Sequence, residues 1–390
     1  MPQAVMPTYN RIPVAFVRGD GSYLYDHTGK AYLDALTGLA VCGLGHAHPK
    51  VAAAIAEQAS TLMHTSNLYR IPGQERLATR LTELAGMDNV FFCNSGAEAN
   101  EAAIKIARLY GHARSIDAPQ TVVMDGSFHG RTMATLTATG NRKVHAGFEP
   151  LLSGFVRAPY DDVESIEKIA ANNKNVVAVM VEPVLGEGGI VIPDPGYLDA
   201  LRGICDRHGW LLMADEVQTG NGRTGRYFAF QHTSAVPDVV TTAKGLGNGM
   251  PIGVCLARGE AAKMLVAGTH GSTFGGNFLA CAAANAVVDE LTDGGLTERA
   301  AELGERMLAR FRDRLRGNNV VKEIRGLGLM VAVELHKPCT ELIGAAVDAG
   351  LLINVTTDTV VRMLPPLTMS DAEADTVVDK VVGLIDDLPA

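Results

Sequence analysis

Short apolar segments alternate with longer helix-like segments between about residues 90 and 260, and this alternation constrains the fold more than any other feature. The apolar segments are almost continuously hydrophobic and rich in β-branched residues, which is typical of strands buried on both faces. Strands are predicted at 90–93, 121–124, 155–158, 176–181, 210–214, 238–243 and 252–257. Helices are predicted between them, for example at 97–110, 163–172 and 195–208. Repeated strand and helix predict an α/β fold with an open, mostly parallel sheet.

The segments on either side of this core are predicted to form a smaller α+β domain. Its expected elements are a hairpin at 16–34, an amphipathic helix at 296–316, strands at 321–334 and 351–355, and a helix at the end of the chain. The hairpin is indicated by Asp20-Gly21 and by a second turn at 28–30. We therefore expect a large domain at 51–290 and a small domain made of 1–50 together with 291–390.

Charge and hydrophobic patterning exclude several classes of function. The chain has 34 basic and 43 acidic residues, a net charge of −9. Nucleic acid and anionic membranes select for basic patches, so neither is expected as a partner. No apolar run approaches the roughly 18 residues of a membrane span, and the first residues do not resemble a signal peptide. We expect a cytoplasmic protein.

Cysteine and histidine residues give no indication of a disulfide framework or a metal site. The six cysteines are scattered without a CxxC pair, which predicts buried free thiols in a reducing compartment. His46 and His48 have no third potential ligand at suitable spacing, so a turn with polar packing is expected there. The GxGxxG pattern at 220–225 is not followed by the helix that dinucleotide binding requires.

The unusual polar residues of the core lie directly after predicted strands. They occupy residues 94–96, 126–131 and 215–218, together with Glu182 and Lys244. Ligands of open α/β sheets bind beyond the carboxyl ends of the strands. Because these ends meet at one edge of a parallel sheet, the residues predict a single site.

Lys244 and Asp215 are the most informative of these residues. Lys244 follows an apolar strand, where apolar surroundings would lower the pKa of its amine and make it nucleophilic. In isolation, a surface lysine is the alternative. Asp215 ends another buried strand, and a carboxylate there is costly unless it meets a cation. A protonated pyridine nitrogen would be such a cation, and the pair would make the ring an electron sink.

Two further segments have both a structural and a functional interpretation. Ser95 and Glu98 have the spacing of a capping box, but Gly96 and the free amides of a helix start would also suit a phosphate. Phe128 would stack on a flat cofactor and Arg131 would bind a substrate carboxylate. A core phenylalanine and a surface arginine are the alternatives.

Several long motifs resemble those of class III (ornithine-type) aminotransferases, which have the fold-type I pyridoxal-phosphate transferase fold. The resemblance is strongest to their bacterial acetylornithine group and covers nearly the whole chain. The motifs are YLDALTGLAVCGLGHAHP, TSNLY, FFCNSGAEANEAAIKIAR, GSFHGRT, EPVLGEGG, DEVQTGNGRTG, AKGLGNGMPIG, GSTFGGN and VVRMLPPL. The fold that it implies has a large domain with a mostly parallel seven-stranded sheet and a smaller α+β domain.

The resemblance also implies a cofactor, pyridoxal 5'-phosphate, and a set of roles. The catalytic residues would be Lys244, bonded to the cofactor as an internal Schiff base, and Asp215 at the pyridine nitrogen. The other cofactor-binding residues would be Ser95, Gly96, Ala97, Phe128, Glu216, Val217, Gln218 and Thr273, the last across the interface of a homodimer. The substrate-binding residues would be Arg131, Ser272, Glu187 and Arg362, with Glu187 neutralising Arg362 when glutamate is absent.

The implied reaction is transfer of the δ-amino group of N-acetylornithine to 2-oxoglutarate, in arginine biosynthesis. Succinylornithine, ornithine, 4-aminobutyrate and N-succinyl-diaminopimelate are alternative amines, because the same cofactor residues serve all of them. A mutase, a decarboxylase and a non-catalytic regulator are more distant alternatives. The chain departs from the common family pattern at Cys42, Leu185, Asn221 and Phe278.

Overall fold

The central sheet of the molecule has seven strands in the order β4-β10-β9-β8-β7-β5-β6. The computed structural model describes residues 4–388. The strands are β4 (Asn89–Cys93), β5 (Gln120–Met124), β6 (Phe155–Ala158), β7 (Val176–Val181), β8 (Leu211–Asp215), β9 (Val239–Thr242) and β10 (Gly253–Ala257). Six of them run in the same direction, and β10 alone runs in the opposite direction. The predicted α/β fold with a mostly parallel seven-stranded sheet is confirmed.

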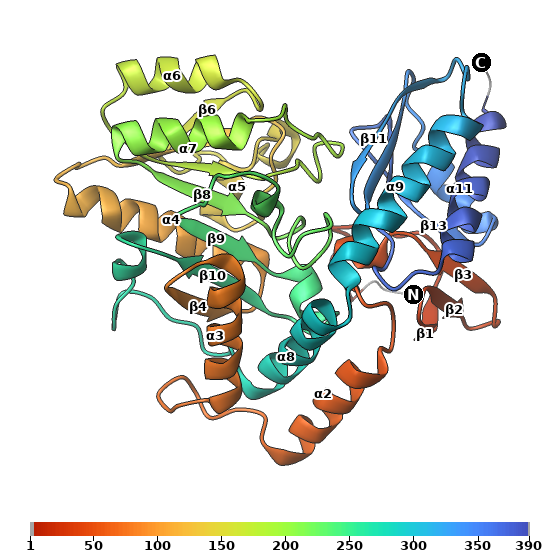
Figure 1. Cartoon of the computed structure of the whole chain (residues 1–390), viewed down its shortest axis with the longest axis horizontal. Helices are drawn as coiled ribbons and strands as arrows, with labels where there is room; N and C mark the ends of the chain where they lie inside the picture. The colour runs from red at the N-terminus through yellow and green to blue at the C-terminus, as the bar shows by residue number, and fades with distance from the viewer. Residues whose placement is uncertain (1–3, 389–390) are drawn as a thin grey trace.

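Helices cover both faces of this sheet, which is why its strands are mostly apolar (Figure 1). On one face, α4 (Gly96–Ala113) and α5 (Met133–Ala138) share a hydrophobic cluster with alternate strand residues such as Val123 and Met180. On the other face, α6 (Val163–Asn172) and α7 (Tyr197–His208) pack on the intervening residues, such as Val122 and Val179. The two-residue period of a strand distributes these side chains between the faces.

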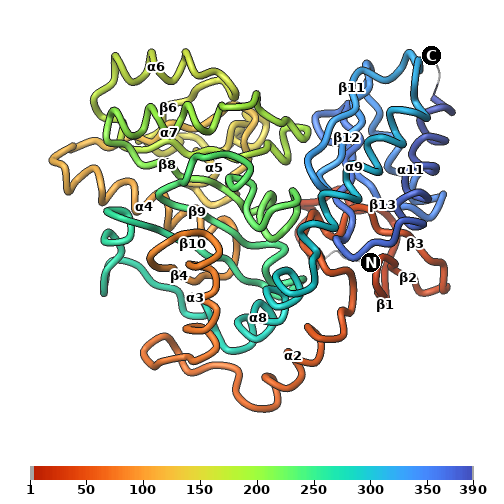
Figure 2. Tube along the Cα trace, viewed as in Figure 1, coloured from red at the N-terminus to blue at the C-terminus, as the bar shows by residue number. Residues whose placement is uncertain are grey.

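The two ends of the chain lie together in a second body beside the central sheet (Figure 2). Its first sheet contains β1 (Phe16–Asp20), β2 (Tyr23–Asp26), β3 (Ala31–Asp34) and β13 (Leu351–Leu352). Its second sheet, in the order β11-β12-β15-β14, contains β11 (Val321–Leu327), β12 (Met330–Leu335), β14 (Asn354–Thr356) and β15 (Val360–Met363). The predicted hairpin at 16–34 is present.

One predicted strand of this body differs from the structure. The segment 351–355 is divided, because β13 pairs with β3 in one sheet and β14 pairs with β15 in the other. The partner of β13 lies more than 300 residues earlier in the chain, so the local pattern does not reveal the division. The parallel pairing of β3 with β13 supports a small domain built from both ends, and its boundaries at 50 and 291 stay a prediction.

The remaining helices connect and cover these sheets. They are α1 (Thr37–Ala40), α2 (Pro49–Thr61), α3 (Pro72–Ala85), α8 (Phe278–Asp293), α9 (Leu296–Arg314), α10 (Leu342–Asp348) and α11 (Asp371–Asp386). In the part of the chain that the structure describes, no helix is long and apolar enough to cross a membrane. All six cysteines are free thiols and five of them are buried, as expected.

Candidate active site

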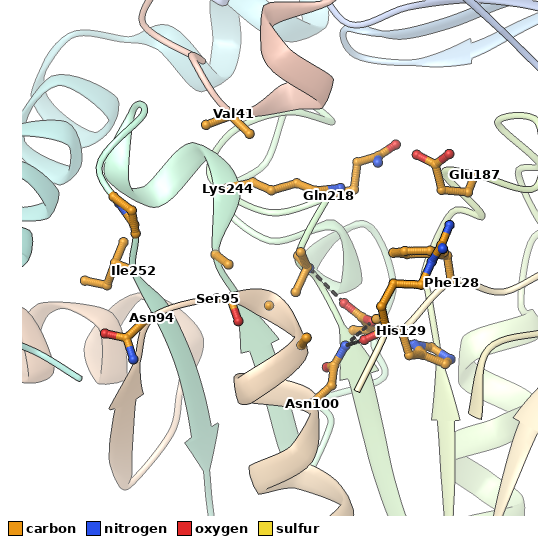
Figure 3. Close-up of a pocket in the computed structure, with 18 of the residues that line it drawn as sticks. Val41, Asn94, Ser95, Asn100, Phe128, His129, Glu187, Gln218, Lys244 and Ile252 are labelled. Atoms are coloured by element: carbon orange, nitrogen blue, oxygen red, sulfur yellow. Dashed lines mark hydrogen bonds and ion pairs between the residues drawn. The ribbon is translucent and has the colours of Figure 1, made fainter. Parts of the chain in front are cut away.

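A cavity of about 450 Å³ opens at the carboxyl ends of the central strands (Figure 3). The predicted site residues that line it are Ser95, Gly96, Ala97, Phe128, Arg131, Glu187, Asp215, Val217, Gln218 and Lys244. β4 joins this edge because it is antiparallel to β10, which is itself antiparallel to β9, so β4 and β9 point the same way. The sheet topology therefore assembles residues from segments far apart in the chain at one place.

Lys244 follows β9 at the start of a 3₁₀ turn, η3 (Lys244–Gly247). Its φ angle of 41° lies in the left-handed region, which is unusual for a residue with a side chain and concentrates at functional sites. Its side chain extends across the cavity towards Gln218 (Figure 3). Burial lowers the pKa of Lys244, although the charge of Glu187 opposes the shift. The lowered pKa increases the neutral, nucleophilic fraction of the amine.

Asp215 is held by three donors at the floor of the cavity. Its Oδ2 accepts hydrogen bonds from Asn100 Nδ2 and His129 Nδ1, each over 2.7 Å. Its Oδ1 accepts from the backbone N–H of Val217 over 3.0 Å. Asn100 is oriented in turn, because its Oδ1 accepts from the Thr241 hydroxyl over 2.6 Å. These bonds fix a buried carboxylate in one orientation.

The helix α4 begins at the cavity. Ser95 Oγ accepts from the N–H of Glu98, as predicted for an N-cap, whereas the Glu98 carboxylate accepts from Asn94 and not from Ser95. A side chain on Gly96 would lie 2.6 Å from Val217 Cγ1, so only glycine fits there. The first-turn N–H groups of Gly96 and Ala97 have no acceptor within the helix and line the cavity. Together with the positive helix end they could hold an anion.

The loop after β5 supplies an aromatic and a cationic side chain. The Arg131 guanidinium lies 5.7 Å from the centre of the Phe128 ring and is exposed at the mouth of the cavity. Glu182 holds this loop, since its Oε1 accepts from the N–H of Phe128 over 2.7 Å and its Oε2 from that of Gly186 over 3.1 Å. Burial, with a contribution from Asp215, raises the pKa of Glu182 to about 7.

Arg362 of β15 reaches this site from the small-domain sheet. Its Nη1 donates to Glu187 Oε1 over 2.8 Å and to the carbonyl of Gly186 over 3.1 Å, and its Nε donates to Asn354 Oδ1 over 3.0 Å. Its Nη2 is buried without a hydrogen-bond partner among the described residues. Burial alone would raise the pKa of Glu187, but the charge and hydrogen bond of Arg362 outweigh it and hold this pKa below its usual value.

Apart from Arg362, which does not line the cavity itself but pairs with Glu187 there, three predicted site residues lie outside the cavity. The Glu216 carboxylate is fully buried on the other side of the turn, where it accepts from Thr219 and from the N–H groups of Ala229 and Phe230. It is therefore a structural anchor, and Val217 faces the cavity instead. Ser272 Oγ accepts from Asn94 Nδ2 over 3.1 Å, in a loop outside the cavity. Thr273 is exposed on the same loop.

Sequence reasoning did not assign roles to Asn100, His129 and Glu182, which orient the predicted residues. Asn100 had a usable signal, because it is a polar side chain on the buried face of α4 between Ala99 and Ala103. The sequence predicts Glu182 at the site, because it follows a strand whose six residues are all apolar and buried, but it does not predict that Glu182 holds the loop after β5. His129 had none beyond its place between Phe128 and Arg131.

The departures from the family pattern have local structural explanations in two cases. Asn221 Nδ2 donates to Thr242 Oγ1 over 2.9 Å and to the carbonyl of Ala243 over 3.1 Å, so Asn221 supports the strand end before Lys244. Phe278 is the first residue of α8, a position where proline is also favoured. Leu185 is buried beside Gly126.

Comparison with known proteins shows which proteins this chain is similar to. Residues 4–385 match the family model described as aminotransferase class-III. An acetylornithine aminotransferase of Nitrosomonas europaea is 58% identical over 381 residues, which are 98% of this chain and 97% of that protein. The crystal structure of the acetylornithine aminotransferase from Elizabethkingia anophelis has a TM-score of 0.89 at 34% identity and covers 98% of this chain and 96% of its own. A Toxoplasma gondii ornithine aminotransferase with partial occupancy of PLP at its active site has a TM-score of 0.94 at 35% identity, covering 98% and 92%.

Proposed function

Because the chain belongs to the class III aminotransferase family, we propose that it transfers the δ-amino group of N-acetylornithine to 2-oxoglutarate, with pyridoxal 5'-phosphate as its cofactor. The reaction would serve arginine biosynthesis. The substrate is supported by the 58% identity to an acetylornithine aminotransferase. The observation that carries the two-substrate reaction is the Glu187–Arg362 pair at the edge of a cavity that contains a partly buried lysine.

The chemistry of the cavity fits pyridoxal 5'-phosphate. Asp215 is a buried carboxylate that needs a cation, which the protonated pyridine nitrogen would supply. The N–H groups of Gly96 and Ala97 suit the phosphate, and Phe128 offers an aromatic face. Lys244 offers an amine with a lowered pKa for the covalent link. When bound, the cofactor supplies an electron sink for negative charge that develops at the substrate carbon.

Lys244 is suited to move the proton of the reaction. Its Nζ would take a proton from the carbon that carries the transferred amine and return it on the cofactor side. An efficient base has a pKa near the working pH, and burial shifts the pKa of Lys244 in that direction. Asn100 and His129 hold Asp215 so that its charge stays directed into the cavity.

Two arginines would recognise the two substrates. Arg131, exposed at the mouth, would bind the α-carboxylate of N-acetylornithine and leave the δ-amine to approach Lys244. Arg362 would bind the α-carboxylate of glutamate or 2-oxoglutarate through a bidentate pair of hydrogen bonds. Glu187 would neutralise Arg362 while the first substrate is bound. Two opposite charges about 4 Å apart in a partly buried site attract by about 4 kcal/mol before desolvation, so a bidentate substrate carboxylate can displace Glu187.

A homodimer would complete the phosphate site. Ser272 and Thr273 lie outside the cavity of their own chain, on a loop beside exposed apolar side chains such as Leu68 and Phe274. Apolar residues gathered on a surface mark sites of association. A second copy on this face would bring its Thr273 to the phosphate. Analytical ultracentrifugation tests the dimer: a monomer that retains full activity would contradict this part of the proposal.

The function is tested by the two half-reactions, followed by the absorbance of the bound cofactor. N-acetylornithine is expected to convert the holoenzyme to its amine-loaded form, and 2-oxoglutarate to restore it. Succinylornithine, ornithine, 4-aminobutyrate and N-succinyl-diaminopimelate are assayed in parallel. If one of these amines has a higher kcat/KM than N-acetylornithine, that amine is the preferred substrate instead. If neither N-acetylornithine nor any of the other amines gives a half-reaction, the proposal is refuted.

A further inference from the structure

Arg325 connects the loop of Glu187 to the small-domain sheet. It lies on β11, and its side chain is only 13% exposed. Its Nη2 donates to the carbonyl of Gly189 over 2.6 Å and its Nε to that of Ile190 over 2.8 Å. These two carbonyls follow Glu187 by two and three residues in the same loop. The planar guanidinium thus holds two consecutive peptide groups at once in a fixed geometry, which the single ammonium of a lysine on its flexible chain does not impose.

The held segment has a backbone conformation that needs support. Both Gly189 and Ile190 have positive φ angles, 106° and 53°. A positive φ in a β-branched residue such as Ile190 is strained and persists only when surrounding contacts stabilise it. The two hydrogen bonds from Arg325 are such contacts. Without these two hydrogen bonds, the loop would relax and the position of Glu187 would change.

The other end of Arg325 is fixed to the sheet that carries Arg362. Its Nη1 donates to Glu323 over 2.7 Å and also pairs with Glu334 of β12. β12 pairs directly with β15, where Ala332 lies opposite Arg362. The same sheet therefore positions Arg362 and, through Arg325, the loop of its partner Glu187.

The two members of the pair are unequal in freedom. The Arg362 side chain is fully buried, whereas that of Glu187 is 36% exposed. Glu187 is therefore the member that can move when a carboxylate arrives, and the position of its backbone decides how well it competes for Arg362. We propose that Arg325 is a positioning residue that sets this competition, and thereby the balance between amine and dicarboxylate substrates. The proposal rests on the function proposed above.

The test compares Arg325→Gln, Arg325→Lys and Lys322→Gln. Lys322 is the matched control, because it donates to the same Glu334 over 2.6 Å but has no hydrogen bond to the Glu187 loop. The first readout is the dissociation constant of 2-oxoglutarate from the cofactor-loaded enzyme, measured by calorimetry. In both Arg325 variants Glu187 competes less effectively for Arg362, so 2-oxoglutarate is expected to bind about threefold to tenfold more tightly. A tenfold change in the dissociation constant is about the free energy of one hydrogen bond to a charged group. The control is expected to match the wild type.

The second readout is amide hydrogen exchange in the peptide containing residues 184–192. We expect faster exchange there in both Arg325 variants and no change in the control. Arg325→Lys keeps the positive charge, so the test can still be made with this variant if Arg325→Gln does not fold. Unchanged 2-oxoglutarate affinity in both variants, or an equal change in Lys322→Gln, would overturn the proposal. Failure of the function itself is distinguishable, because the wild type would then show no half-reaction with N-acetylornithine.

Discussion

Arg362 Nη1 and Glu187 Oε1 lie 2.8 Å apart, and only the arginine of this pair is fully buried. A fixed cation with a movable neutralising partner can accept a carboxylate without leaving a buried charge unpaired when the carboxylate departs. On the proposed function, this relationship would let one cavity serve an amine donor and a dicarboxylate acceptor in turn.

Glu187→Gln should change the two half-reactions in opposite directions. Without the competing charge, the dissociation constant of 2-oxoglutarate should fall by about tenfold. The kcat/KM for N-acetylornithine should fall by a similar factor, because Arg362 is then free to capture its carboxylate in a non-productive orientation. Stopped-flow absorbance measures both half-reactions, and Glu164→Gln on the exposed face of α6 is the control. Parallel losses in both directions would contradict this account.

Arg362→Lys should impair only the dicarboxylate half-reaction. Lysine keeps the positive charge but lacks the planar fork, so the KM for glutamate should rise at least about tenfold. The N-acetylornithine half-reaction, which depends on Arg131, should change less than about threefold by the same reasoning. Steady-state assays with each substrate varied separately distinguish these outcomes. An equal rise in both KM values would show that the two arginines do not divide the substrates.

Asn100→Ala should weaken cofactor binding through its effect on Asp215. The change leaves Asp215 with one fewer donor, and a hydrogen bond to a charged group contributes about 1.5–3 kcal/mol. The dissociation constant of pyridoxal 5'-phosphate should therefore rise at least about tenfold. Fluorescence titration of the cofactor-free protein measures it. Asn172→Ala, at the exposed end of α6, is the control, and equal affinity in both variants would contradict the role given to Asn100.

The buried Glu216 should make the protein less stable as the pH rises. Burial raises its pKa from 4.5 to about 7 in the folded protein. Between these values the folded state holds a proton that the unfolded state has released, so stability is fully present below pH 4.5 and is lost as the pH rises through 7. The protonation of Glu216 therefore contributes about 3 kcal/mol to the free energy of unfolding at low pH.

Glu216→Gln isolates this contribution, because a neutral amide mimics the protonated carboxyl. Urea unfolding at pH 5 and pH 8 should show a smaller loss of stability in the variant than in the wild type. The same pH dependence in both proteins would assign the effect to other groups.

The sequence predicted the central sheet well because strands buried on both faces are apolar throughout, as in β7. It also placed Lys244 and Asp215 at one edge, since strand ends are easily located and parallel strands align them. It could not separate Glu216 from Val217, because the direction of each side chain depends on the turn after β8. Asn100 and His129 act through Asp215, across 115 and 86 residues of chain, so the sequence could not reveal their partner, although the polar side chain of Asn100 on an apolar helix face is itself a local signal. The role expected of Thr273 depends on a second subunit, so the structure of one chain does not test it.

The central claim is that Lys244 forms the covalent link to the cofactor. Borohydride reduction of the yellow holoenzyme, followed by proteolysis and mass spectrometry, tests it most directly. We expect the pyridoxyl mass on the peptide that contains Lys244, and no labelled peptide from a Lys244→Ala variant that remains folded. A label on another lysine, or an active enzyme with no label, would contradict the account.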